Sequence, residues 1–253
     1  MLSRKPWLPE VVMMFIGAIV LGACVTNLAA LALHSAHVPG FRQPDDIGFL
    51  LCATLGMQGL ALVFIPIFLW MNETTLRTAF GLDQPDWPKS ILLAAGLVII
   101  VLPVVESLQF GSQWLLEKLH IQTETEAAVQ MFLNETTFAG RCYMVVFAVI
   151  IAPVAEEFIF RGVLYPFIKE LGWPRSAFVG VSALFAGIHF DLAALIPLFI
   201  LALFLTWLYE KTNCLLASIT VHSLFNAANV ILLFLAPQVS DTLQKTGHAP
   251  LPQ

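Results

Sequence analysis

Charged residues are scarce in this sequence. Lys and Arg number 12 and Asp and Glu 17 among 253 residues, so 11% of the chain is charged, against roughly 25% in soluble domains. Apolar residues make up 58% of the chain, and the mean hydropathy is +0.84. So few polar side chains cannot cover this apolar mass in water, which excludes a soluble globule and a disordered chain. The net charge of -5 provides no basic excess to neutralise phosphates, which argues against nucleic acid as a partner.

Cysteine is scarce too, and several catalytic signatures are missing. The four cysteines have no C-x-x-C spacing, so the sequence predicts neither a disulfide framework nor a thiolate metal site. It contains no G-x-S-x-G, H-E-x-x-H or P-loop pattern. Serine hydrolase, zincin and nucleotide-driven functions therefore lack support.

Long apolar stretches are abundant. Most are about 18 residues or longer, enough for a helix to cross a bilayer. The seven stretches are Val11–Leu33, Ile47–Met71, Ser90–Leu108, Cys142–Ile168, Ser176–Phe190, Leu192–Tyr209 and Cys214–Ala236. The sequence thus predicts an all-α polytopic membrane protein with about seven transmembrane helices, organised as one integral membrane domain over residues 1–253. Ser176–Phe190 is the shortest stretch, and we expect a tilted or partly re-entrant helix there.

The basic residues outside these stretches predict the orientation. Seven lie on the side of the N-terminus, namely Arg4, Lys5, Arg77, Lys89, Lys169, Arg175 and Lys211. Four lie on the other side, namely Arg42, Lys118, Arg141 and Lys245. The positive-inside rule then places the N-terminus in the cytoplasm. The first stretch is longer than the core of a secretory signal, so we interpret it as an uncleaved anchor.

Polar side chains that remain inside the apolar stretches are the informative ones, because each is costly at membrane depth unless it is paired or faces a cavity. In the fourth stretch Glu157 and Arg161 are four residues apart on one helical face, the spacing of an ion pair. Glu156 is turned about 100° away and has no partner in its own helix. Pro153, one turn earlier, is expected to bend the helix near this point. A single ion pair does not need a second carboxylate, so Glu156 indicates a site.

Two further stretches contribute polar groups at a similar depth. His189 belongs to the fifth stretch, and His222 and Asn226 are four residues apart in the seventh. Together with Glu156 they lie 11 to 15 positions from the cytoplasmic basic residues, about 17–23 Å at 1.5 Å per residue. A carboxylate can take a proton from water, a histidine can pass it on, and a His/Asn pair can donate hydrogen bonds to an oxyanion. These groups are what amide hydrolysis requires.

The sequence contains three patterns in this order: Glu156-Glu157-x-x-x-Arg161, Phe185-x-x-x-His189 and His222-x-x-x-Asn226. Together they resemble the three ordered motifs of the CPBP family. This family comprises the bacterial Abi proteins and their relative, the eukaryotic CAAX prenyl endopeptidase. The resemblance to the bacterial members implies a bacterial plasma membrane protein. The resemblance implies an intramembrane endopeptidase with a catalytic core over residues 142–236, formed by the fourth, fifth and seventh helices. The resemblance does not identify a substrate; from the predicted orientation we expect a membrane-embedded or lipid-anchored peptide or protein that reaches the site from the cytoplasmic leaflet of the lipid bilayer.

The resemblance also implies roles for single residues. Glu156 would activate water, His189 would orient that water or share its proton, and His222 with Asn226 would stabilise the oxyanion. Glu157 and Arg161 would hold the fourth helix, and Phe185 would pack beside His189. Glu156, His189 and His222 match zinc ligands in number and type. Because a metal-bound Glu156 is less free to act as the base, we favour a mechanism that requires no cofactor and keep zinc as the alternative.

Two other classes of function remain as alternatives. A proton-coupled transporter would also place acids and histidines at mid-membrane. Glu106, after Pro103 in the third stretch, is the residue that supports this alternative, although we expect it near the external end of its helix. A membrane immunity or scaffold protein that no longer catalyses is the other alternative.

Overall fold

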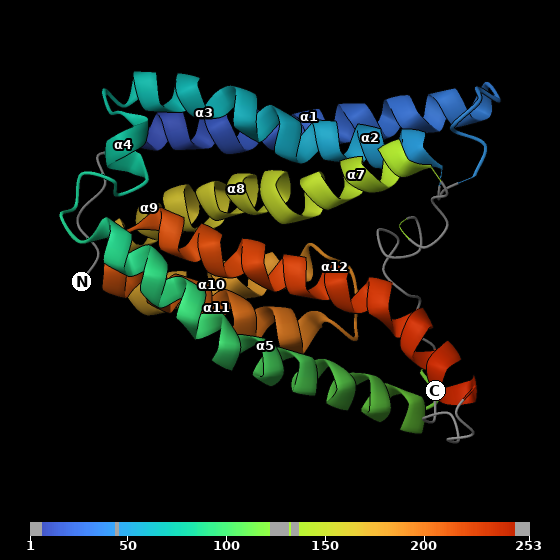
Figure 1. Ribbon diagram of the computed structural model, residues 1–253. Helices are drawn as coiled ribbons and strands as arrows, with labels where there is room; N and C mark the ends of the chain where they lie inside the picture. The colour runs from blue at the N-terminus through green and yellow to red at the C-terminus, as the bar shows by residue number, and fades with distance from the viewer. Residues whose placement is uncertain (1–6, 44–45, 122–131, 133–136, 246–253) are drawn as a thin grey trace.

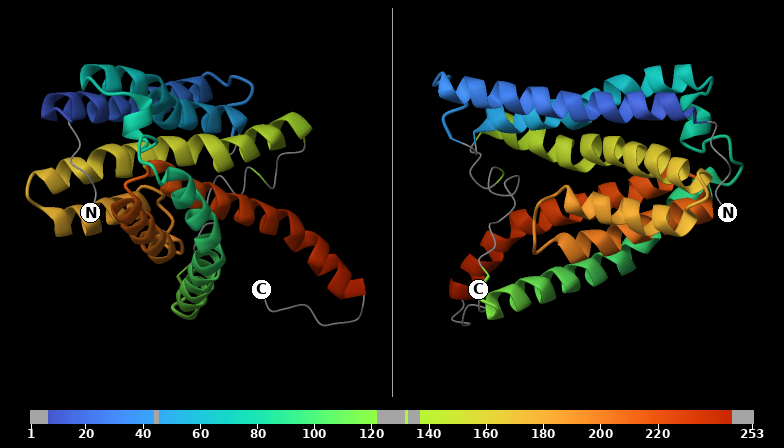
Figure 2. Two further views of the ribbon diagram at one scale, coloured as in Figure 1. Left: turned by 60° about the vertical axis from the view of Figure 1, so that its left-hand side comes forward. Right: turned by 180° about the vertical axis from the view of Figure 1, so that it is seen from behind.

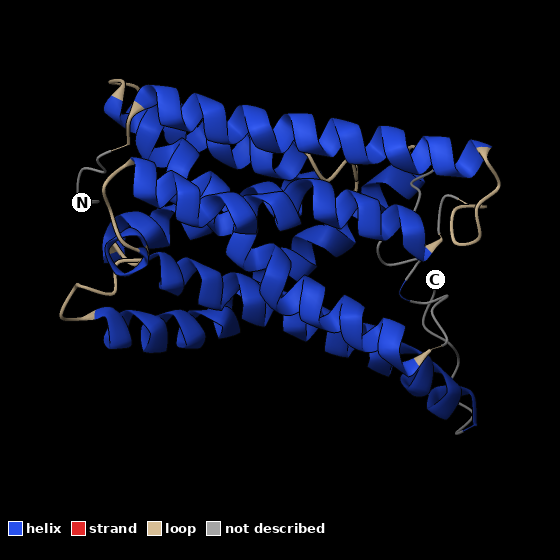
Figure 3. Cartoon of the chain, turned by 90° about the horizontal axis from the view of Figure 1, so that it is seen from above, coloured by secondary structure: helices blue, strands red, loops and turns tan. Residues whose placement is uncertain are grey.

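In the residues that the structure describes, all regular secondary structure is helical, which confirms the all-α fold (Figure 3). The computed structural model describes residues 7–43, 46–121, 132 and 137–245, with side chains up to residue 235. Six helical segments within these residues are long and apolar enough to cross a membrane. These segments are Pro9–Ser35, Ile47–Met71, Trp87–Lys118, Phe138–Glu170, Leu195–Thr212 and Leu215–Leu235. The chain is an integral membrane protein.

The second and fourth spans are composite helices. The second span consists of α2 (Ile47–Thr54), the π-helical turn η1 (Leu55–Gly59) and α3 (Leu60–Met71). The fourth span consists of α7 (Phe138–Val146), η2 (Phe147–Ile151), α8 (Ala152–Glu157), η3 (Phe158–Leu164) and α9 (Tyr165–Glu170), of which η2 and η3 are π-helical. The other elements are α1 (Pro9–Ser35), α4 (Leu76–Ala79), α5 (Trp87–Lys118), α10 (Pro174–Gly187), α11 (Leu195–Thr212) and α12 (Leu215–Lys245).

The fourth span lies in the middle of the molecule. Figure 1 shows it between a layer formed by α1, α2 and α3 and a group formed by α5, α10, α11 and α12, and Figure 2 shows the same order from two other sides. Within the span, α8 contacts η1 of the second span and also contacts α12. A side chain on α8 can therefore reach partners in two different spans.

Several of the predicted helix ends are wrong; α12, for example, continues from the predicted end at Ala236 to Lys245. α5 continues from the predicted end at Leu108 to Lys118, because hydropathy marks only the apolar part of a helix that runs on through polar residues. The fifth helix, α10, ends at Gly187 instead of Phe190. Its end follows from the backbone: Phe190 has a left-handed φ of 53°, a conformation that cannot continue a right-handed helix.

α10 has 14 residues and is the short element that the sequence predicts. It packs against α11, which follows it in the chain. The two helices enter and leave the bundle from one end (Figure 1). The turn between α10 and α11 therefore lies inside the depth that the longer helices span.

Proline shapes the fourth span and ties it to its neighbours. In an α-helix the carbonyl of Gly162 would accept the N–H of residue 166, which is Pro166 and has none. The indole Nε1 of Trp7 donates to this carbonyl instead, at 2.8 Å. Trp7 is buried, and its ring lies edge-on to Phe68 of α3, 5.0 Å between centroids. Trp7, at the start of the described residues, thus provides a hydrogen-bond donor for a backbone carbonyl of the fourth span.

We expect Trp7→Phe to lower the free energy of unfolding by about 1–3 kcal/mol, because it leaves the buried Gly162 carbonyl without a donor. In a Pro166→Ala background the loss should be smaller, since Ala at 166 has an N–H that the carbonyl can accept. Unfolding of the native chain, the two single variants and the double variant in lipid bicelles measures this coupling. Equal losses in both backgrounds would mean that the indole contributes by packing alone.

Candidate active site

A buried ion pair lies at the centre of the fourth span. Arg161 Nη1 donates to Glu157 Oε1 at 2.8 Å, and both side chains are 0% exposed. The guanidinium also donates to the carbonyl of Ala202 at 3.1 Å and to Thr206 Oγ1 at 3.4 Å, both on α11. The structure thus contains the pair that the four-residue spacing predicts, and adds an anchor on α11 that the spacing does not reveal.

Glu157 has a second partner, His222 of α12. His222 Nδ1 lies 2.9 Å from Glu157 Oε1, and only 4% of His222 is exposed. Because a carboxylate only accepts hydrogen bonds, His222 Nδ1 carries a proton. Its other ring nitrogen, Nε2, faces Glu156 Oε2 at 3.9 Å. Glu157 therefore fixes the tautomer and direction of His222, a contact between residues 65 positions apart that no local spacing could predict.

The carboxylate of Glu156 is held between two spans. Its Oε1 accepts a hydrogen bond from Gln58 Nε2 of η1 at 3.2 Å, while its Oε2 faces His222. Glu156 is 7% exposed. The ion pair of Arg161 is with Glu157, so Glu156 has no direct cationic partner on its own helix among the described residues. One oxygen of Glu156 is thus fixed and the other is open toward an imidazole.

The phenyl ring of Phe185, on α10, lies among the polar groups. Its centroid is 5.0 Å from that of His189 and 5.7 Å from that of His222, and the Arg161 guanidinium lies 4.6 Å from it. His189 stands in the turn just after α10, where its Nδ1 donates to the Phe185 carbonyl at 2.7 Å. This leaves Nε2 of His189 without a proton in the neutral ring. In the described part of the chain no hydrogen bond joins His189 to Glu156.

Asn226 binds a backbone group exposed by Pro153. In η2 the N–H of Ala152 bonds to the carbonyl of Phe147, five residues back. The next residue is Pro153, which has no N–H, so the carbonyl of Ala148 receives neither backbone donor. Asn226 Nδ2 donates to it at 2.8 Å. One N–H of this amide thus joins α12 to the fourth span, and the second is available for another acceptor.

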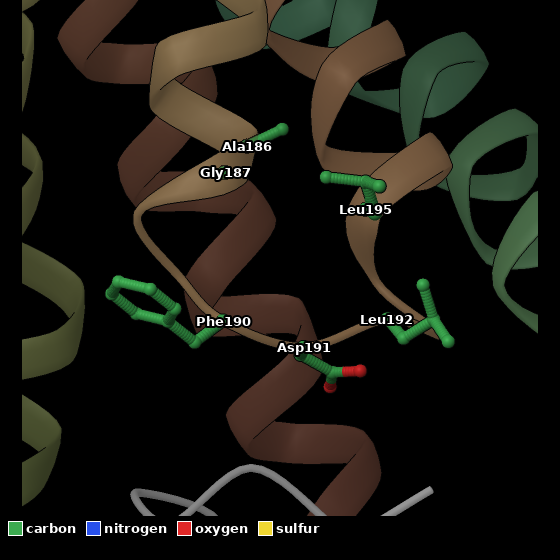
Figure 4. A pocket seen from close by; sticks show the side chains of 6 residues that line it. All are labelled: Ala186, Gly187, Phe190, Asp191, Leu192 and Leu195. Atoms are coloured by element: carbon green, nitrogen blue, oxygen red, sulfur yellow. The ribbon is translucent and has the colours of Figure 1, made fainter.

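A pocket of about 240 Å³ lies at the turn between α10 and α11 (Figure 4), the turn that also contains His189. It is lined by Ala186, Gly187, Phe190, Asp191, Leu192 and Leu195. Asp191 Oδ1 accepts the N–H groups of Ala193 and Ala194 and so stabilises the turn that leads into α11. The mainly apolar lining suits an apolar side chain or a lipid group.

The sequence predicts that Glu106 lies near the external end of its helix, and this prediction is wrong, because α5 runs on to Lys118. Its half-buried side chain faces the amide of Asn229 on α12. Asn229 is one turn beyond Asn226. Glu106 is therefore at mid-helix and has a polar partner, separate from the pair formed by Glu156 and His222.

The described residues do not assemble a metal centre. They contain no group of three or more His, Cys, Asp and Glu side chains placed to hold a metal ion. Both His189 and His222 have Nδ1 bound to an oxygen, an arrangement typical of zinc-bound and of proton-transferring histidines alike. The donor set Glu156, His189 and His222 thus has the residue types of a zinc site, but the described residues do not place them in a three-ligand geometry.

Comparison with known proteins supports the family resemblance that the three motifs indicate. Residues 138–228 match the family model described as type II CAAX prenyl endopeptidase Rce1-like, which confirms the resemblance to the CPBP family. The chain is 31% identical to UPF0177 protein YaiF of Lactococcus lactis subsp. lactis over 146 residues, which cover 56% of this chain and 62% of YaiF. It is 27% identical to UPF0177 protein YxdF of the same organism over 172 residues, 66% of this chain and 88% of YxdF. No solved structure matches the chain significantly.

Proposed function

We propose that this chain, which carries an Rce1-like region at residues 138–228, is an intramembrane endopeptidase. The observation that carries the proposal is the pair formed by Glu156 and His222. Both side chains are buried, and Glu156 Oε2 and His222 Nε2 are 3.9 Å apart. That separation is too long for a direct hydrogen bond and suits a water molecule that bridges the two atoms.

The proposed reaction is hydrolysis of a peptide bond by water that Glu156 activates. Glu156 Oε2 takes a proton from the water while the water oxygen attacks the carbonyl carbon of the substrate. The tetrahedral intermediate then loses its amine, which receives the proton from Glu156. His189, whose Nε2 is free of a proton in the neutral ring, orients the water or shares that proton.

His222 and Asn226 are proposed to stabilise the oxyanion. Because His222 Nδ1–H points at Glu157, Nε2 can donate to an oxyanion only when the ring is protonated. In the proposed step the ring therefore carries both protons. Asn226 would contribute its second N–H, which the Ala148 carbonyl leaves available.

The surroundings of the site support a proposal for the substrate class. Glu156 and His222 lie inside a bundle of membrane-spanning helices, and the pocket at the turn between α10 and α11 is mainly apolar. A membrane-embedded or lipid-anchored peptide or protein can present a peptide bond at this depth, whereas a soluble peptide would first have to be desolvated. We propose such a substrate.

The test is peptide cleavage by the full chain in lipid vesicles. A panel of lipid-anchored and membrane-inserted peptides is incubated with the native chain and with Glu156→Ala, and the products are identified by mass spectrometry. We expect the native chain to cleave at least one peptide and Glu156→Ala to cleave none. If no peptide is cut by a folded native chain, a non-catalytic scaffold or a transporter becomes the better interpretation.

Chelation separates the two proposed mechanisms. We expect the cleavage rate to be unchanged after treatment with a strong zinc chelator, because in our proposal the base is the Glu156 carboxylate itself. A known zinc peptidase in the same vesicles serves as the positive control for chelation. Loss of cleavage that added zinc restores would instead assign Glu156, His189 and His222 as metal ligands.

A further inference from the structure

Gln58 is a polar residue inside a membrane-spanning helix, and its presence there calls for a physical explanation. It lies in η1, in the middle of the second span, and is half-buried. A primary amide inside an apolar helix is costly unless it is hydrogen-bonded. The second span lies outside residues 138–228, which match the Rce1-like model.

The π-helical turn η1, which carries Gln58, contacts both α1 and α8. Gly56, two residues earlier, packs so closely on α1 that a Cβ there would lie 1.9 Å from Thr26 Oγ1. Two residues correspond to about half a turn, so Gln58 projects from the opposite side of the helix. That side faces α8 of the fourth span. Close packing at Gly56 thus fixes the helix with Gln58 toward the site.

The partner of Gln58 is the residue proposed as the base. Gln58 Nε2 donates to Glu156 Oε1 at 3.2 Å. In the described residues this is the one direct hydrogen bond that the Glu156 carboxylate receives, since His222 Nε2 is 3.9 Å from the other oxygen. Gln58, Glu156 and His222 therefore form a row across three spans.

From this row we infer that Gln58 is the positioning residue of the catalytic base, an inference that rests on the proposed function. An amide N–H on Oε1 restrains rotation of the carboxylate and leaves Oε2 directed at the water and His222. The amide is uncharged, so it orients Glu156 without forming an ion pair that would hold its charge too firmly for proton transfer. The π-turn that carries Gln58 is of a kind often found at functional sites.

The kinetic test compares Gln58→Met, which keeps the length of the side chain and removes the donor, with Asn27→Leu. Asn27 is the matched control because its exposed amide donates to the carbonyl of Ala23 within α1 and faces no site residue. In lipid vesicles we expect Gln58→Met to lower kcat by about 10- to 100-fold with KM within about 2-fold. Asn27→Leu should keep the native kcat. A native kcat in Gln58→Met, while cleavage by the native chain still requires Glu156, would overturn the inference and leave the proposed function standing.

A second measurement needs no substrate. Thermal unfolding of the native chain, Gln58→Met, Glu156→Leu and the double variant tests whether the two side chains act together. We expect the shift in midpoint caused by Gln58→Met to become much smaller in the Glu156→Leu background. Additive shifts would overturn the inference. If the native chain cleaves nothing, the proposed function fails, and this coupling still decides whether Gln58 holds Glu156.

Discussion

Glu156→Gln is expected to lower kcat by about 10²- to 10⁴-fold, the contribution of a well-placed general base. The substitution keeps the size of the side chain and an oxygen that can accept from Gln58, so the row of three spans is preserved. It removes the oxygen that takes the proton from water. Since the amide also occupies the same volume, KM should change little. Steady-state cleavage of a peptide identified from the panel measures both constants.

Glu106→Gln is the matched control for this substitution. Glu106 is a half-buried acid inside a different span, and its neighbour is Asn229 on α12. We expect the Glu106→Gln variant to cleave at the native rate, because Glu106 is not one of the residues that contact Glu156. An equal loss of activity in both variants would contradict a single catalytic carboxylate. It would mean that a carboxylate in another span also takes part in the cleavage.

The spans could be predicted because the bilayer imposes a simple requirement on them. A spanning helix needs about 20 apolar residues, so the sequence marks it without any knowledge of its neighbours. The second span illustrates this, since the predicted stretch and the observed helix share the bounds Ile47–Met71. The end of α5 could not be predicted, because residues beyond Leu108 continue the helix without being apolar enough to mark it.

The site could be predicted only where it depends on local spacing. Glu157 and Arg161 are four residues apart, and helical geometry alone brings them together. The contact between Glu157 and His222 depends on how α12 crosses the fourth span, which no single-helix pattern contains. The site residues predicted from the sequence do not include Gln58. The sequence nevertheless contains a signal for it, because Gln58 is an amide inside an apolar stretch, between Gly56 and Gly59.

The π-helical turns explain a further gap between sequence and structure. The sequence predicts a bend at Pro153, but not that Asn226 would bind the carbonyl left without a backbone donor. The same holds for Trp7 and the carbonyl opposite Pro166. In both cases proline removes a donor locally, and the replacement comes from a side chain far away in the sequence. Only the packed structure shows which side chain replaces it.

Arg161→Met is expected to lower the free energy of unfolding by about 3–5 kcal/mol, the loss that follows when one partner of a buried ion pair is removed. The Glu157 carboxylate would remain in the core with the His222 imidazole as its hydrogen-bond partner, and its Oε2 has no hydrogen-bond partner among the described residues even in the native chain. The guanidinium contacts with Ala202 and Thr206 would be lost as well. Chemical unfolding in lipid bicelles measures the change.

Removing both charges distinguishes an unpaired charge from lost packing. In Glu157→Leu/Arg161→Met no carboxylate is stranded, so we expect much of the stability to return. Activity should stay low, because His222 Nδ1 then has no acceptor to set its orientation. Lys169→Met is the control: it removes a cation paired with Glu210 where the two side chains are 24% and 18% exposed, and water limits the loss to about 1 kcal/mol or less. If Arg161→Met cost no more than Lys169→Met, the buried pair would not be what holds the fourth span in place.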